Sequence, residues 1–188
     1  MIRRITSLLK DRWLIARDPV GYARKVGVNV GPDCWLAGCE RGVFGTEPYL
    51  ITLGRRVAMA HGVRFVTHDG GAWIFREEFP DLDVVGRITI GDNVMLGMNA
   101  ILLPGTEIGD WSVVAAGAVV SGSFPPGSLI AGMPGKVVGA IEDYKQRSLA
   151  RGIFVAGLPH EERRRYFEGF LDGTLDNRGN PIEPDPPA

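Results

Sequence analysis

The feature that most constrains the fold of this chain is an aliphatic residue at every sixth position. Between residues 90 and 120 the repeat is unbroken, and its members are Ile90, Leu96, Leu102, Ile108, Val114 and Val120. The fourth position after each aliphatic residue is mostly small or β-branched, and the positions between carry turn residues such as Gly91, Asp92 and Asn93. Because a helix repeats every 3.6 residues, this spacing excludes a helical fold for the segment.

Each hexad is explained by one short strand followed by one bend. The fourth position and the next aliphatic residue are two apart, so they lie on the same face of a strand, and the turn residues form the corner. Three hexads would close one triangular coil, with aliphatic side chains stacked along its axis. The pattern therefore predicts an all-β solenoid.

The same register occurs upstream, at Leu53, Met59 and Phe65, and residues 30–37 suggest a degenerate first coil. From Leu53 to Ile90 is 37 residues, one more than six hexads, and the pattern is missing from residues 67–87. We therefore expect an inserted loop over residues 67–87. A long loop in a regular fold is usually functional or disordered.

The segments outside the repeat predict helices. Apolar residues recur at helical spacing among Lys and Arg near the N-terminus, at Ile2, Ile5, Leu8, Leu9, Trp13 and Ile15. This amphipathic helix would pack on the solenoid or a neighbouring subunit, or lie on a membrane surface. We expect a helical cap over residues 1–25, the β-helix domain over 26–140, a C-terminal helical region over 141–175, and a disordered tail over 176–188.

Composition narrows the function classes. The chain has 188 residues, 45% of them apolar, and a formal charge of -1, which indicates a folded core and no general attraction to nucleic acid. No apolar run has the length of an integral membrane segment, and no signal-peptide core is present, so we expect a cytoplasmic protein. Cys34 and Cys39 are too few for a disulfide framework or a zinc site, and we interpret them as buried apolar residues.

The inserted loop opens with Thr67, His68 and Asp69. A histidine placed where the chain leaves the solenoid is anchored by the coil and exposed to a groove. Imidazole can accept a proton near neutral pH, which suits a general base acting on a hydroxyl or an amine. The alternative is that His68 only caps the loop. His61, at a corner, and His160, off the solenoid, are weaker candidates.

The hexads, the loop opening at His68 and the segment from Phe124 to Val138 resemble the left-handed β-helix acyltransferases of the hexapeptide-repeat superfamily. The resemblance covers residues 26–140. It is closest to the polysaccharide and lipopolysaccharide O-acetyltransferases and the xenobiotic acetyltransferases, whose catalytic histidine also opens an extended loop. The run from Gly45 to Ile51 is similar to the sugar-modifying branch.

This resemblance implies a left-handed parallel β-helix and a homotrimer with active sites between neighbouring subunits. It implies acetyl-CoA as the acyl donor and no metal. The pantetheine arm would lie along backbone groups near Gly97, Ala115, Ala116 and Ala131, with the nucleotide phosphates near Lys136. The left hand comes only from the resemblance, since crossovers between parallel strands are otherwise nearly always right-handed.

For the reaction we expect direct acetyl transfer to a sugar hydroxyl of a bacterial surface polysaccharide or its precursor. His68 would take the hydroxyl proton as the oxygen attacks the thioester and return it to the CoA thiolate, without an acyl-enzyme. A backbone N–H near Gly97 would stabilise the oxyanion. Asp69 is the expected second catalytic residue, although it could instead orient the loop while Asp83 or Glu77 reaches the imidazole.

We expect Trp73, Phe75 and Arg76 to contact the acceptor, since aromatic faces suit sugar rings; alternatively, the aromatic residues pin the loop to its scaffold. Three other functions stay open. One is N-acetyl transfer to a nucleotide-linked amino sugar or to serine. Another is a non-catalytic β-helix scaffold. The third is a metal enzyme of the γ-carbonic anhydrase kind, which needs three histidines, whereas the repeats contain only His61 and His68.

Overall fold

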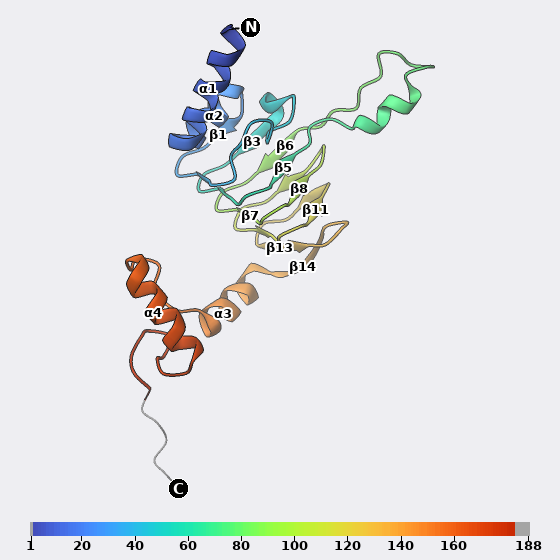
Figure 1. Ribbon diagram of the computed structural model, residues 1–188. Coiled ribbons are helices and arrows are strands. Elements are labelled where there is room, and N and C mark those ends of the chain that lie inside the picture. Colours follow the sequence, from blue (N-terminus) through green and yellow to red (C-terminus); the bar gives the residue numbers. More distant parts are fainter. Residues whose placement is uncertain (1, 183–188) are drawn as a thin grey trace. The chain divides into compact units, whose positions relative to one another are not determined.

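The computed structural model describes residues 2–182, with side chains from residue 8 onward. The chain divides into two compact units, Met1–Ile141 and Glu142–Ala188. The first unit is a stack of three-stranded coils preceded by two helices, as Figure 1 shows.

Each complete coil contributes one strand to each of three sheets. Sheet A contains, in spatial order, β1 (Asn29–Val30), β3 (Ile51–Leu53), β6 (Ile88–Ile90), β9 (Glu107–Ile108) and β12 (Ser123–Phe124). Sheet B contains β2 (Trp35–Leu36), β4 (Ala58–Met59), β7 (Met95–Leu96), β10 (Val113–Val114), β13 (Ser128–Ala131) and β14 (Lys136–Ala140). Sheet C contains β5 (Arg64–Phe65), β8 (Ile101–Leu102) and β11 (Val119–Val120). All neighbours pair in parallel except β13 and β14. Three parallel sheets of stacked short strands are typical of the left-handed β-helix, and the predicted fold is confirmed.

The aliphatic register forms the core. Every member from Leu53 to Val120 is at most 2% exposed. Equivalent positions pair across neighbouring coils, as in Leu96 beside Val114 and Leu102 beside Val120. The degenerate first coil is also confirmed, because Val30 pairs with Leu53.

The corners between sheets A and B are held by carboxylates from one coil to the next. Asp92 Oδ1 accepts the backbone N–H of Arg55 at 2.7 Å, and Asp110 Oδ1 accepts that of Asp92 at 2.7 Å. Asn93 and Trp111 occupy the left-handed turn position of two of these corners, with φ of 56° each. The turn residues of the hexads therefore close the corners, as their types predict.

Two helices cover the first coil, where the sequence predicted one cap. Helix α1 (Ile2–Arg17) is separated from α2 (Pro19–Val26) by Asp18, whose carboxylate accepts the N–H of Gly21 at 2.7 Å as an N-cap. Helix α2 buries Tyr22 and Ala23 in the core. None of the helices within residues 2–182 has the length and apolarity needed to cross a bilayer.

The C-terminal unit contains the two predicted helices, α3 (Ile141–Arg151), which begins at its boundary, and α4 (His160–Leu171). The described part of the predicted tail, residues 176–182, contains a hydrogen-bonded turn. There Asp176 Oδ1 accepts the N–H groups of Arg178 and Asn180, each at 2.8 Å, and closes a turn. Residues 183–188 of the predicted tail lie outside the described residues.

Candidate active site

The inserted loop leaves the β-helix between β5 and β6 through a narrow neck. His68 bridges Val85 in antiparallel fashion, the N–H of Asp69 donates to Val84 at 2.7 Å, and that of Gly86 donates to Thr67 at 2.9 Å. Beyond the neck the chain forms the 3-10 helix η2 (Gly70–Phe75), which stands away from the coils in Figure 1. The neck fixes the backbone of His68 at the corner between sheets C and A.

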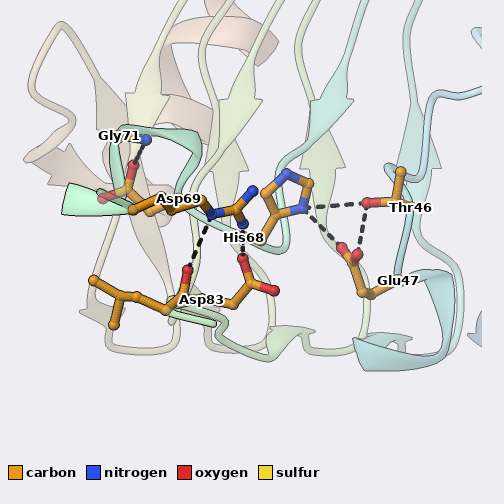
Figure 2. Close-up of polar contacts among 8 residues, drawn as sticks. Thr46, Glu47, His68, Asp69, Gly71 and Asp83 are labelled. Atoms are coloured by element: carbon orange, nitrogen blue, oxygen red, sulfur yellow. Dashed lines mark hydrogen bonds and ion pairs between the residues drawn. The ribbon is translucent and has the colours of Figure 1, made fainter. Parts of the chain in front are cut away.

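The imidazole of His68 is held by a carboxylate from the preceding coil. Glu47 Oε2 lies 2.9 Å from His68 Nδ1, and Thr46 Oγ1 lies 3.2 Å from the same nitrogen. Thr46 and Thr67 donate their hydroxyls to the two oxygens of Glu47 at 2.6 and 2.7 Å. Figure 2 shows that the second ring nitrogen, Nε2, points away from Glu47 and Thr46.

These hydrogen bonds fix the charge of Glu47 and the tautomer of His68. The hydroxyls of Thr46 and Thr67, together with the His68 imidazole, lower the pKa of Glu47 from 4.5 to about 2. An ionised carboxylate can only accept, so Nδ1 is the nitrogen that carries a proton, and in the neutral imidazole the lone pair is then on Nε2. The arrangement matches the base and orienting acid of histidine-dependent acyl transfer.

The acid that contacts His68 is therefore none of the three that the sequence suggested. Asp69 Oδ1 accepts the N–H of Gly71 at 2.8 Å and caps η2, which is the loop-orienting role considered as its alternative. Asp83, labelled in Figure 2, forms an ion pair with Arg76, another residue of the loop, and not with His68. Glu77 has no contact with His68 among the hydrogen bonds of the described residues.

A cavity of about 540 Å³ opens beside His68, a size in the usual range for small-ligand sites. Its lining residues come from the first coil, the neck and the loop: Thr46, Glu47, His68, Asp69, Gly70, Trp73, Arg76, Asp83 and Val85. The Trp73 side chain is 71% exposed and offers an aromatic face. Phe75, the third residue expected to contact the acceptor, does not line this cavity.

The residues expected to bind coenzyme A lie at a different edge of the same β-helix. Gly97, Ala115 and Ala131 follow aligned residues of sheet B and form a row of small residues at the corner between sheets B and C. Lys136 on β14 pairs with Ala131. Within one chain the row and His68 therefore occupy separate corners.

Two backbone N–H groups in this row already donate hydrogen bonds to the next coil. The N–H of Gly97 donates to Val114 at 2.8 Å, and that of Ala115 donates to Ile130 at 2.8 Å. Within one chain the N–H of Gly97 is therefore not free, and the oxyanion donor expected near Gly97 stays a prediction. This glycine has a packing role, because a Cβ there would lie 2.6 Å from the backbone nitrogen of Ala116.

Sequence reasoning missed Glu47, Thr46 and the role of Thr67. The available signal was positional: the run that begins at Gly45 lies one coil before Thr67 and His68 and reaches the same corner. The N–H of Phe65 donates to Val43 at 3.0 Å, which aligns the two segments. Among residues 2–182, no group of three histidine, cysteine or acidic side chains could hold a metal ion.

The fold and site define a transferase of the hexapeptide-repeat class. Residues 87–122 match the family described as "Bacterial transferase hexapeptide (six repeats)". Relatives that align with most of the chain agree with this family match. The chain belongs to the hexapeptide-repeat acetyltransferase family.

Three relatives illustrate this membership. "Protein CapG" of Staphylococcus aureus is 43% identical over 157 residues, covering 84% of this chain and 90% of that protein. "Galactoside O-acetyltransferase" of Escherichia coli is 45% identical over 154 residues, covering 76% and 71% respectively. "Putative lipopolysaccharide biosynthesis O-acetyl transferase WbbJ" of Escherichia coli is 35% identical over 96 residues, covering 47% of this chain and 49% of that protein.

Proposed function

We propose that this chain transfers the acetyl group of acetyl-CoA to a hydroxyl of a saccharide, with His68 as the general base. The observation that carries the proposal is the Glu47–His68 pair, which leaves Nε2 available beside a cavity of sugar size. The names of two relatives, a galactoside and a lipopolysaccharide-biosynthesis O-acetyltransferase, support a sugar acceptor. On this basis the acceptor is a surface polysaccharide or its precursor.

In this mechanism acetyl-CoA supplies an activated thioester. His68 Nε2 takes the proton of the acceptor hydroxyl as its oxygen bonds to the thioester carbonyl carbon. The carbon–sulfur bond then breaks, and His68 returns the proton to the thiolate, so no acyl-enzyme forms. Glu47 stabilises the imidazolium between these steps and, with a pKa of about 2, does not take the proton itself.

Trp73 is the acceptor platform in this proposal. Its indole is exposed and lines the cavity together with Arg76, which can donate hydrogen bonds to sugar hydroxyls. Asp69 acts indirectly, by capping η2 and so fixing the segment that carries Trp73. Phe75 lies outside the cavity of one chain and remains a prediction.

The proposed site takes residues from two copies of the chain. His68 and the row of small residues lie at different corners, so an acyl donor along Gly97, Ala115, Ala116 and Ala131 would meet the His68 of another subunit. The small side chains leave room for an extended pantetheine arm, and Lys136 at the end of the row suits phosphates.

The outer faces of the sheets support a trimer. Sheet A presents mostly polar side chains outward: Asn29, Thr52, Thr89, Glu107 and Ser123. Most outward side chains of sheets B and C are apolar, with Arg64 on β5 as a charged exception; the apolar ones are Ala58, Met95, Ile101, Val113, Val119 and Leu129. Such a face suits burial against a neighbouring subunit.

The first test is titration of acetyl-CoA into the wild type and His68→Ala, followed by thiol-release assays with a panel of sugars. His68→Ala should bind acetyl-CoA like the wild type and lose turnover by a factor of about 10² to 10⁴, the usual contribution of a general base. His160→Ala, in α4, is the matched control and should stay active. Absence of acetyl-CoA binding in the wild type would favour a scaffold instead.

A second test addresses the shared site. His68→Ala and Ala115→Trp chains, each inactive alone, would be refolded together as mixed assemblies. If each site combines His68 of one subunit with the row of another, random mixing restores roughly one quarter of the wild-type activity. If each site lies within one chain, the mixture stays inactive.

A further inference from the structure

Helix α1 carries a second apolar face that stays exposed. Leu9 is 61% and Trp13 is 59% exposed, and their four-residue spacing makes them neighbours on one side of the helix. Leu14, at the edge of this face, and Ile15, on the other side, are partly buried and pack against the core of the first unit. Only one of the two apolar faces is therefore needed to hold α1 in place.

The charges around this exposed face are almost all positive. Residues 2–17 contain five basic residues and a single acidic one, Asp11. Asp11 lies on the packed side, where it pairs with Lys25 at 2.7 Å and Arg41 at 3.6 Å. Three exposed basic residues flank the apolar face and have no ion pair within the described part of the chain: Lys10, Arg12 and Arg17.

The exposed face is also hollowed. Leu9, Trp13 and Leu14 line a groove of about 430 Å³ that is bounded by Lys10 and Lys25. The guanidinium of Arg17 lies 5.2 Å from the centre of the Trp13 ring. The groove thus combines apolar lining residues with basic residues at its edge. We call the groove together with Lys10, Arg12 and Arg17 the α1 surface.

We propose that the α1 surface docks on an anionic lipid bilayer, with the helix lying in the plane of the interface. Interfacial helices combine such an apolar face with basic flanks, and tryptophan prefers the boundary between headgroups and acyl chains. A second copy of this chain fits the same surface poorly, because docking like on like would bring the basic flanks together. The proposal does not depend on the acetyl-transfer reaction.

The test is sedimentation of the full chain with vesicles of phosphatidylcholine alone, or of phosphatidylcholine with roughly one third phosphatidylglycerol. The wild type should bind the anionic vesicles and dissociate from them at high salt. It should not bind the neutral vesicles. Leu9→Gln/Trp13→Gln and, separately, Lys10→Gln/Arg17→Gln should each lower the partition coefficient about tenfold or more. Trp111→Asn removes another exposed tryptophan, 62% accessible, and should bind like the wild type.

Four results would overturn the proposal. The wild type could fail to bind anionic vesicles, or bind neutral ones equally well. The Leu9/Trp13 variant could bind as the wild type does. Light scattering without lipid could show that this variant forms a smaller assembly than the wild type, which would make the α1 surface a contact between copies of the chain.

Discussion

Replacing Glu47 by glutamine should slow acetyl transfer roughly ten- to a hundredfold while leaving the fold intact. Glutamine keeps the shape of the side chain and one acceptor oxygen, but it removes the negative charge that faces the imidazolium during transfer. At the Nδ1–Oε2 distance of 2.9 Å, Coulomb's law gives about 1.4 kcal/mol in bulk water and about 2.9 kcal/mol at an effective dielectric constant near 40. These high dielectric constants apply because water reaches both side chains: His68 is 43% exposed and Glu47 is 23% exposed.

The assay is kcat/KM for the acceptor by thiol release at saturating acetyl-CoA, with calorimetry to show that acetyl-CoA still binds. Asp69→Asn is the matched control, since it makes the same carboxylate-to-amide change at the same cavity. It keeps an oxygen for the N–H of Gly71 and should cost no more than about threefold. Glu47→Gln activity within about twofold of the wild type, or a larger loss in Asp69→Asn, would refute the assignment of Glu47.

Three further predictions follow from the same geometry. Gly97→Ala would place a Cβ 2.6 Å from the Ala116 nitrogen, and overpacking of about 1–3 kcal/mol should lower Tm by roughly 3–10 °C in calorimetry; an unchanged Tm would contradict the packing role of Gly97. Hydrogen bonds from Thr46, Thr67 and His68 lower the pKa of Glu47 to about 2. The folded state therefore binds the proton of the Glu47 carboxyl group less tightly than the unfolded state does. The contribution of Glu47 to stability should be complete above about pH 4.5 and decline as the pH falls toward about 2. Denaturant unfolding at several pH values should accordingly show the gap between wild type and Glu47→Gln shrinking on acidification, and a constant gap would contradict this. Trp73→Ala should raise the acceptor KM about three- to tenfold without changing acetyl-CoA affinity; equal effects on both would argue against an acceptor platform.

The sequence by itself determined the β-helix, and it predicted His68 as the candidate base. The aliphatic residue at every sixth position is a local repeat, and a solenoid buries each repeat mainly against its neighbours, so the repeat predicts both the coil and its core. Leu53 to Val120 lie inside as the register requires. His68 was found because it stands where the repeat breaks.

The tertiary structure alone decided what completes the site. Glu47 and His68 are 21 residues apart and meet only because one coil stacks on the next with their corners aligned. That alignment depends on the first coil, which is irregular. Its length cannot be predicted from the six-residue repeat. The stacking of coils also determined that the N–H of Gly97 is hydrogen-bonded to the next coil. The packing of α1 determined which of its two apolar faces stays exposed, because burial depends on neighbours that the local sequence does not specify.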